Sequence, residues 1–384
     1  MDVKTAFLSG FLKEELYMMQ PKGFVDPKGA NKVCKLQRSI YGLVQTSRSW
    51  NIHFDEVIKA YGFIQTFGEA CIYKKVSGSF VAFLILYVDD ILLIGNDVEF
   101  LDNIKGYLNK SFSMKDLGEA AYILGIKIYR DRSRRFIGLS QSTYLDKVLK
   151  KFKMDQSKKG FLPVLQGVKL IQTQYPTTSE DREKMKVIPY ASAIGSIMYT
   201  MLCTRPTDVC LAISLAERYQ SNPGLDHWTA VKNILKYLKR TKDMFLVYGG
   251  DKELIVSGYV GASFDTDPDD SKSQTEYVFI LNGGAVSWCS SKQSVMAGST
   301  CEAEYIAASE VTNEGVWMKE FISYLGVIPS ASGPMKIFCD NTGAIALAKE
   351  SRFHKRTKHI KRCFNSIRDQ VKEGDIEICK IHRI

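Results

Sequence analysis

The sequence lacks the features of a secreted or membrane-spanning protein. No apolar run reaches the roughly 20 residues that a membrane-spanning helix needs. The charged residues Asp2 and Lys4 follow Met1 directly, where a signal peptide would continue toward an apolar stretch. We therefore expect a soluble protein with no membrane partner. The cytoplasm is the expected compartment, and the nucleus is the alternative.

Paired cysteines are also missing. The chain has nine cysteines among 384 residues, and no two of them have Cys-x-x-Cys spacing. The sequence therefore indicates neither a zinc site nor a disulfide framework, and we expect reduced thiols with mostly structural roles. The nine are Cys34, Cys71, Cys203, Cys210, Cys289, Cys301, Cys339, Cys363 and Cys379.

The chain is long, globular in composition and basic. Its 384 residues predict two or three domains, and a hydrophobic content of 45% is enough for a substantial core. The net charge of +10 favours polyanionic partners such as nucleic acids, although a merely soluble basic protein could have the same charge. Two groups of basic residues are candidate phosphate contacts. They are Arg130, Arg132, Arg134 and Arg135, and then Lys147, Lys150, Lys151, Lys153, Lys158 and Lys159.

The most informative stretch runs from Phe83 to Asp97. Two apolar, β-favouring runs flank Asp89 and Asp90, which predicts a β-hairpin with both carboxylates at or beside its turn. Aspartate is common in turns, so one interpretation is that the pair only reverses the chain. The other is that the two carboxylates, which repel each other, bind a divalent cation. Oxygen ligands of this kind suit Mg²⁺ or Mn²⁺.

The segment Tyr87-Val88-Asp89-Asp90 resembles the Tyr-x-Asp-Asp box of reverse transcriptases, and its surroundings resemble the copia-type retrotransposon form of that enzyme. Further segments resemble the same family, in the family's order, along nearly the whole chain. They are Met1-Asp2-Val3-Lys4-Thr5-Ala6-Phe7-Leu8, Gln37-Arg38-Ser39-Ile40-Tyr41-Gly42-Leu43, Lys115-Asp116-Leu117-Gly118, Tyr122-Ile123-Leu124-Gly125-Ile126, Ser299-Thr300-Cys301-Glu302-Ala303-Glu304-Tyr305, Cys339-Asp340-Asn341 and Arg356-Thr357-Lys358-His359-Ile360.

The resemblance implies an RNA-directed DNA polymerase within a retrotransposon Pol polyprotein. Such an enzyme would use Mg²⁺ or Mn²⁺, an RNA template, a DNA primer, an RNA/DNA hybrid and deoxynucleoside triphosphates (dNTPs). In the family it acts in cytoplasmic virus-like particles. Asp2, Asp89 and Asp90 match the metal ligands of the polymerase reaction.

The same resemblance implies a nucleotide-binding group. Phe7 matches an aromatic residue that excludes a 2′-hydroxyl, and we expect it on the strand that Asp2 opens, on the opposite face. Tyr41 and Gly42 match the nucleotide pocket, and Lys115 matches a lysine that could protonate the pyrophosphate leaving group. Without the resemblance, Phe7 would be a core aromatic, Gly42 a bend and Lys115 a solvated lysine.

The C-terminal part resembles an RNase H domain that lacks half of its metal-binding acids. Glu304 and Asp340 match two of the four, but Gly261 and Lys361 occupy the other two positions. Asn365 also stands where the family pattern favours histidine. Four nearby acids fall in a predicted loop and should aim elsewhere: Asp265, Asp267, Asp269 and Asp270. We predict that the RNase H fold persists without metal-dependent cleavage.

We expect an α+β chain in three parts: a reverse-transcriptase palm at 1–155, a helical thumb or connection at 156–242, and an α/β RNase H-like domain at 243–384. The basic helices of the middle part would hold a nucleic-acid duplex or act as a spacer. Ser140 could cap the helix that follows it, whose apolar stripe runs from Tyr144 to Phe152. Residues 155–187 read as an extended connection. Periodicity predicts helices at 49–61, 98–112, 190–202, 207–219, 226–240, 302–325, 342–349 and 361–372. It predicts strands at 32–36, 245–248, 254–263, 277–281, 285–288 and 335–339.

Three hypotheses about activity follow. The intact set Asp2, Asp89 and Asp90 favours an active polymerase. The family's fingers region would precede Asp2, which is the second residue here, and Val44 stands where the copia pattern usually has lysine. Together with the degenerate RNase H acids, these features favour an inactive remnant of the polyprotein, and we expect this state for the chain. The basic charge alone supports the alternative, a domesticated non-catalytic nucleic-acid-binding protein.

Overall fold

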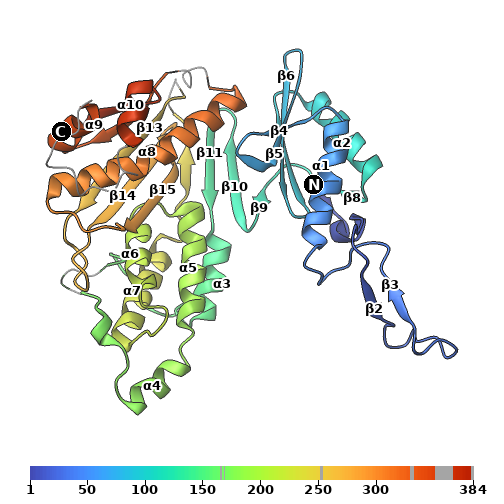
Figure 1. Cartoon of the computed structure of the whole chain (residues 1–384), viewed down its shortest axis with the longest axis horizontal. Helices are drawn as coiled ribbons and strands as arrows, with labels where there is room; N and C mark the ends of the chain where they lie inside the picture. Colours follow the sequence, from blue (N-terminus) through green and yellow to red (C-terminus); the bar gives the residue numbers. More distant parts are fainter. Residues whose placement is uncertain (165–166, 168, 251–253, 329–332, 351–365, 382–384) are drawn as a thin grey trace. The chain divides into compact units, whose positions relative to one another are not determined.

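The computed structural model describes residues 1–164, 167, 169–250, 254–328, 333–350 and 366–381. Within them, residues 1–120 and residues 121–384 form two compact units, each of which combines helices with sheets (Figure 1). Among the described residues, no single helix has the length and apolar character to cross a membrane. The helices Ser179–Lys186 and Tyr190–Thr204 meet both criteria only when taken together, across a 48° bend.

A six-stranded antiparallel sheet is the framework of the first unit. Its strand order is β4-β5-β6-β7-β1-β8, so β1, the first strand of the chain, lies inside the sheet next to the predicted hairpin. That hairpin is β6 and β7, as the two apolar runs on either side of Asp89 and Asp90 predicted. The strands are β4 (Ile64–Thr66), β5 (Glu69–Ser77), β6 (Phe80–Tyr87), β7 (Asp90–Gly95), β1 (Asp2–Val3) and β8 (Met114–Lys115).

Two helices cover one face of this sheet, α1 (Thr46–Ala60) and α2 (Val98–Ser111) (Figure 1). Helical spacing places Trp50, Phe54 and Ile58 of α1 on one buried stripe, which confirms the predicted core helix. A hydrogen bond joins the two helices, because the Tyr107 hydroxyl of α2 donates to the Val57 carbonyl of α1 at 3.0 Å. The sheet contributes alternate residues of β6 to the same core: Ala82, Leu84 and Leu86.

One strand prediction in this unit is wrong. Phe7 does not continue the strand that Asp2 opens, because β1 ends at Val3 and Thr5 adopts a left-handed conformation, with φ 54°. Phe7 lies instead in a short 3₁₀ helix, η1 (Ala6–Ser9). Beyond it, β2 (Tyr17–Met19) pairs with β3 (Val33–Lys35) in a separate two-stranded sheet. The strand predicted at 32–36 is thus confirmed.

The second unit begins with a four-stranded sheet in the order β12-β11-β10-β9. The strands are β12 (Leu246–Tyr248), β11 (Phe136–Ser140), β10 (Ile126–Asp131) and β9 (Tyr122–Ile123). Four helices then share one apolar core: α3 (Ser142–Lys151), α5 (Tyr190–Thr204), α6 (Asp208–Glu217) and α7 (Leu225–Thr241). The periodic patterns at 190–202, 207–219 and 226–240 predicted the last three of them.

Two predictions in the helical part need correction. Residues 155–187 are not one extended connection, because they contain η2 (Gln172–Gln174) and a helix, α4 (Ser179–Lys186). Thr178 starts that helix by accepting a hydrogen bond from the Asp181 amide at 3.1 Å. Ser140 is the last residue of β11 and does not cap α3, whose N-cap residue is Gln141.

The C-terminal part is a five-stranded sheet with helices packed on it (Figure 1). Its order is β15-β14-β13-β16-β17, in which β13, β16 and β17 pair in parallel and β14 is antiparallel to both of its neighbours, β13 and β15. The strands are β13 (Val256–Ser263), β14 (Gln274–Leu281), β15 (Gly284–Lys292), β16 (Met335–Cys339) and β17 (Ile376–Lys380). The helices are α8 (Thr300–Leu325), α9 (Thr342–Lys349) and α10 (Ser366–Glu373).

The long helix α8 forms the core of this part with the sheet. Glycine at 258 is required there, since a Cβ at that position would lie 2.7 Å from the Phe279 ring. The strands and helices predicted between 243 and 349 are confirmed. Of the helix predicted at 361–372, residues 361–365 lie outside the described residues, and α10 covers the rest. The domain boundaries at 155 and 242 stay predictions.

Candidate metal centres

The hairpin turn consists of two residues, Val88 and Asp89, and Tyr87 pairs with Asp90 across it. Val88 has φ 59°, a left-handed conformation that is strained for a β-branched side chain. The indole N–H of Trp50 donates to the Val88 carbonyl at 2.5 Å. A buried helix residue therefore holds the strained residue that directly precedes Asp89.

Asp2 lies between two of the other predicted site residues. In the sheet, it pairs with Asp90 on one side and with Lys115 on the other. Residues directly opposite each other in an antiparallel sheet project to the same face, with Cβ atoms about 4.5–5.5 Å apart. Asp89 is tied to the same strand, because its carbonyl accepts the Val3 amide at 2.9 Å. The structure thus brings together Asp2, Asp89, Asp90 and Lys115, which were predicted from segments far apart in the sequence.

The electrostatics of this group favour a cation. Burial raises the pKa of Asp90, and the negative charges of Asp89 and Asp2 raise it further. The donor set consists of carboxylate oxygens, which fits a hard divalent ion. Within the described part of the chain, however, Asp2, Asp89 and Asp90 are not among the sets of three ligand atoms that lie within 4.8 Å of one another. Their side chains would have to close around an ion.

The predicted nucleotide-binding residues also gather. The rings of Phe7 and Tyr41 lie 5.1 Å apart, centroid to centroid. Phe7 is half-buried, whereas Tyr41 is 57% exposed. Gly42 has φ 97°, which favours glycine, and a Cβ there would meet nothing within 4 Å. Val44, in the position where the family usually has lysine, is 93% exposed.

A second group lies in the C-terminal sheet and includes both predicted RNase H acids. One ligand atom each from Glu304, Cys339 and Asp340 lies within 4.8 Å of the others. Glu304 is on α8, Cys339 ends β16, and Asp340 follows it. The Ala262 amide donates to Glu304 Oε1 at 3.0 Å, so Gly261, the residue before Ala262, lies beside this group. Burial, and to a smaller degree Asp340, raises the pKa of Glu304.

Gly261 leaves space where the family pattern has an acid. A Cβ at that position would meet no atom within 4 Å. Tyr259 of β13 pairs with Phe338 of β16 in a parallel register. Two residues further along both strands, the same register places Gly261 opposite Asp340. The other replaced position, Lys361, and Asn365 lie outside the described residues, as does the segment 356–360.

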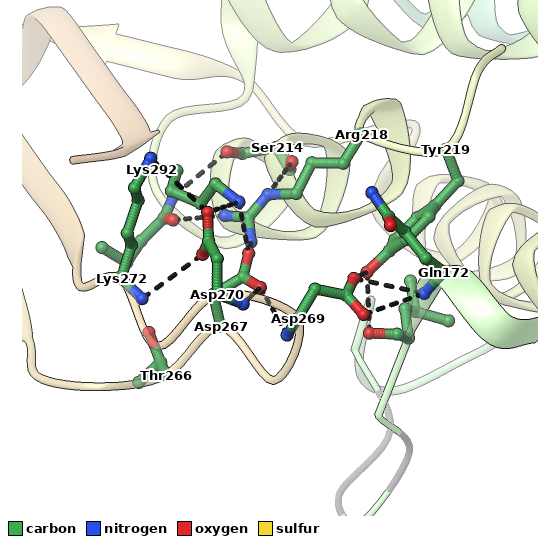
Figure 2. A network of polar contacts seen from close by, with 12 residues as sticks. Gln172, Ser214, Arg218, Tyr219, Thr266, Asp267, Asp269, Asp270, Lys272 and Lys292 are labelled. Carbon is green, nitrogen blue, oxygen red and sulfur yellow. Dashed lines mark hydrogen bonds and ion pairs between the residues drawn. The ribbon is translucent and has the colours of Figure 1, made fainter. Parts of the chain in front are cut away.

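Three acids of the loop between β13 and β14, Asp267, Asp269 and Asp270, bind elsewhere (Figure 2). Asp267, 3% exposed, pairs with Arg218 and, at 2.9 Å, with Lys292. Burial alone would raise the pKa of Asp267, but the hydrogen bond from Lys292 and the charges of Lys292 and Arg218 lower it. Asp270 also pairs with Lys292 at 3.0 Å, and Asp269 accepts a hydrogen bond from the Tyr219 hydroxyl at 3.1 Å.

These contacts give the loop acids a structural role. They join the loop to α6 and to the residues around it, and Gln172 adds a backbone N–H that donates to Asp269 at 3.0 Å (Figure 2). Sequence reasoning did not find this network, because Arg218 and Asp267 are 49 positions apart. It also missed Cys339 as a member of the second group, since no spacing pattern links that residue to Glu304.

Comparison with known proteins identifies the family of the chain. Residues 1–166 match the family model "Reverse transcriptase (RNA-dependent DNA polymerase)". The putative transposon Ty5-1 protein YCL074W of Saccharomyces cerevisiae is 32% identical over 315 residues, which are 82% of this chain and 100% of that protein. The chain belongs to the copia-type reverse transcriptase family. The earlier resemblance is thereby confirmed.

Longer family members match almost the whole chain. The Retrovirus-related Pol polyprotein from transposon TNT 1-94 of Nicotiana tabacum is 44% identical over 99% of this chain and 28% of its own length. The polyprotein from transposon RE2 of Arabidopsis thaliana is 33% identical over 99% of this chain and 25% of its length. This reverse-transcriptase chain thus spans about a quarter of these polyproteins. A solved structure, the foamy viral protease-reverse transcriptase in complex with double-stranded DNA, has a TM-score of 0.22 to this chain. This value is too low to indicate a shared fold.

Proposed function

We propose that Asp2, Asp89 and Asp90 form the divalent-metal centre of RNA-directed DNA synthesis in this reverse-transcriptase chain. One observation carries the proposal: Asp2 pairs with Asp90 on one side and with Lys115 on the other. Bound Mg²⁺ or Mn²⁺ would neutralise the charge of a triphosphate and of the attacking primer hydroxyl. The residues' own part is to hold such ions at the hairpin, with Lys115 beside them as a proton donor to the leaving group.

The aromatic pair would position the incoming dNTP. Phe7 and Tyr41 are in contact, and Gly42 leaves the approach beside them open. In this proposal Phe7 is the group that excludes a ribose 2′-hydroxyl. Val44 carries no charge to bind a triphosphate, and it is fully available to solvent. We therefore expect this chain to bind nucleotides weakly and to synthesise no DNA by itself.

The partners would be an RNA template, a DNA primer and their hybrid. All of the basic residues first noted at 130–135 and 147–159 have exposed side chains, so phosphate groups can reach them. The proposed domains are the palm at 1–155, the helical thumb or connection at 156–242 and an RNase H-like domain at 243–384. In the family's setting these would act together in cytoplasmic particles.

The RNase H-like part would no longer cleave. Cleavage needs carboxylates that hold two metal ions around the scissile phosphate. Glu304 and Asp340 remain, but Gly261 offers no oxygen from a side chain, and the loop acids Asp267, Asp269 and Asp270 are engaged in other contacts. Incubating the chain with an RNA/DNA hybrid and Mg²⁺ tests this, and we expect the RNA strand to stay intact. Metal-dependent cleavage that Glu304→Gln abolishes would contradict the proposal.

Primer extension tests the polymerase half. The assay uses purified chain, poly(rA)/oligo(dT) and Mg²⁺ or Mn²⁺, with Asp89→Asn as the variant and circular dichroism as the check of folding. We expect no extension. Extension that disappears in Asp89→Asn would show that the expected inactivity is wrong and that the metal centre works. Extension that persists in Asp89→Asn would contradict the centre itself.

A further inference from the structure

Ser39 is a fully buried polar residue within a segment that is otherwise open to solvent. It is 0% exposed, although Arg38 before it and Tyr41 after it are both exposed. A buried hydroxyl is costly unless it has hydrogen-bond partners, so its contacts indicate what the residue does. The contacts of Ser39 lead to the short helix η1, which contains Phe7.

The hydroxyl and the amide of Ser39 both bind carbonyls at the end of η1. The hydroxyl donates to the Phe7 carbonyl oxygen, and its Oγ lies 3.3 Å from the carbonyl oxygen of Gly10, the C-cap residue. The Ser39 amide donates to the same Gly10 oxygen at 3.1 Å. Carbonyls at the end of a helix have no partner within the helix. Ser39 therefore supplies partners that η1 itself lacks, and one of them belongs to Phe7.

Helix α1 fixes both of the pieces that Ser39 joins. A Cβ on Gly10 would lie 2.9 Å from the backbone carbonyl carbon of Ser49, so the end of η1 lies directly against the backbone of α1. The Thr46 hydroxyl, at the start of α1 and 2% exposed, donates to the Ile40 carbonyl at 2.7 Å. The segment after Ser39 is therefore tied to the same helix.

These bonds control how two aromatic rings lie beside each other. The centroids of Phe7 and Tyr41 are 5.1 Å apart, and Tyr41 lies two positions after Ser39. The same serine thus holds the backbone of one ring and precedes the other in the chain. A group that excludes a ligand by its size must be held to within about 0.5 Å of its working position. Without the bond to its carbonyl, Phe7 would be free to move away from Tyr41 and admit a larger sugar.

We propose that Ser39 is a positioning residue for nucleotide selection, which fixes the backbone of Phe7 beside Tyr41 and thereby sets the discrimination against a ribose 2′-hydroxyl. The inference rests on the proposed function, in which Phe7 excludes this hydroxyl. It does not require DNA synthesis, because binding alone compares the two sugars. Ser39 acts through Phe7 and does not itself contact the nucleotide.

The test compares the binding of dATP and ATP, which differ only in the 2′-hydroxyl. The full chain is mixed at low salt and in Mg²⁺ with a poly(rU)/oligo(dA) hybrid whose primer ends in a dideoxynucleotide, so that no bond can form. Ligand-observed nuclear magnetic resonance measures the Kd of each nucleotide even where binding is weak. We expect the wild-type chain to bind dATP at least about tenfold more tightly than ATP, because a closely fitting site rejects an added hydroxyl.

Ser39→Ala should lower this preference to about threefold or less, with little change in the Kd of dATP. Phe7→Ala should remove the preference, and adding Ser39→Ala to it should change nothing further, because both substitutions act through the same ring. Ser140→Ala is the matched control. Ser140 is 1% exposed in β11 of the second unit, and its Oγ accepts the Ser142 amide at 3.3 Å. This control should lose stability and keep the wild-type preference.

A second variant, Ser39→Cys, decides the question where Ser39→Ala does not fold. A thiol fills similar space but is a weak donor, so the preference should fall in this variant too. A wild-type preference in a folded Ser39 variant, or an equal fall in Ser140→Ala, would overturn the inference and leave the role of Phe7 intact. If neither Ser39 variant folds, Ser39 serves the fold and the inference is wrong.

Failure of the proposed function gives a different result. The wild-type chain would then bind dATP and ATP equally or not at all, or Phe7→Ala would retain the preference for dATP. Either outcome removes the role of Phe7, and the role of Ser39 is lost with it.

Discussion

The indole N–H of Trp50 donates a hydrogen bond to the carbonyl oxygen of Val88, 2.5 Å away. Trp50 belongs to α1 and is 2% exposed, whereas Val88 is half of the two-residue turn that carries Asp89. The bond therefore links the rigid core of the first unit to the proposed metal centre. Because Val88 holds a strained conformation, we infer that this bond helps to fix the turn.

Trp50→Phe should loosen the turn while keeping an aromatic ring against Phe54 and Phe112. The Val88 carbonyl would lose its donor, which costs about 1–3 kcal/mol of unfolding free energy. Urea unfolding measures the loss, and Mn²⁺ binding at the hairpin should weaken with it. The control is Trp317→Phe, because Trp317 is 38% exposed and stacks on Phe321. Equal effects of the two substitutions would contradict a specific role for the Trp50 bond.

Val88→Gly should stabilise the chain. A left-handed conformation destabilises a residue with a side chain by about 1–2 kcal/mol, and glycine removes this strain. The greater flexibility of glycine in the unfolded chain offsets about 0.5–1 kcal/mol of the resulting stabilisation. We expect a net increase of about 0.5–1 kcal/mol in the free energy of unfolding. Val76, at 59% exposure near the end of β5 and paired with Val81, provides the comparison, since Val76→Gly should destabilise. A loss of stability in Val88→Gly would show that the turn is not strained.

The buried histidine His227 should make stability depend on pH. Its Nδ1 accepts the Gly224 amide at 2.9 Å, its Nε2 lies 3.1 Å from the Ile171 carbonyl, and its ring stacks on Tyr219. Burial lowers the pKa of His227 below its ordinary value of 6.5. The unfolded chain therefore binds a proton at a higher pH than the folded chain does.

The sign of the effect follows directly. The contribution of His227 to the free energy of unfolding is complete above pH 6.5. It is lost as the pH falls from there toward the lower pKa that His227 has in the folded state. Urea unfolding between pH 7.5 and 5 measures it. Substitution by glutamine, His227→Gln, should remove this part of the slope, whereas His53→Gln, at a half-buried histidine, should not. A wild-type slope retained in His227→Gln would contradict the assignment.

Gly261→Asp should return an oxygen ligand to the second metal group. The position has room, because a Cβ would meet no atom within 4 Å, and the neighbouring Ala262 amide already binds Glu304. We expect Mg²⁺ to bind at least tenfold more tightly to the variant than to the wild-type chain, as measured by isothermal titration calorimetry. Gly261→Asn is the matched control, since it adds similar volume without a charge. Equal Mg²⁺ binding by the two variants would show that residue 261 does not face the group.

Much of this architecture could be predicted from the sequence, because its elements have strong local patterns. The two apolar runs of β6 and β7 predicted the hairpin, and helical spacing in α1 predicted its supporting helix. Phe7 was misplaced because Thr5 turns the chain, and a conformation with φ 54° at threonine has no reliable sequence signal. Helix α4 was missed because it is short and polar, although Thr178 and Asp181 had the spacing of an N-cap.

The candidate sites depended on information of a different kind. Asp2, Asp89 and Asp90 could be named because each lies in a recognisable family segment, and the sheet then paired Asp2 with Asp90. Cys339 also lies in a family segment, Cys339-Asp340-Asn341, but the resemblance gave no metal-binding role to this residue. It meets Glu304 only because α8 packs on β16, and no rule of spacing along the chain links two residues that are 35 positions apart.

Mn²⁺ binding at the hairpin tests the central claim most directly. Electron paramagnetic resonance of Mn²⁺ with the full chain measures bound ions, and Glu304→Gln throughout weakens the second group of acids. The account predicts a bound Mn²⁺ that Asp89→Asn displaces at least tenfold more easily, while Asp102→Asn, at an exposed carboxylate of α2, has no effect. Equal Mn²⁺ binding by the parent chain and Asp89→Asn would contradict a metal centre at Asp2, Asp89 and Asp90.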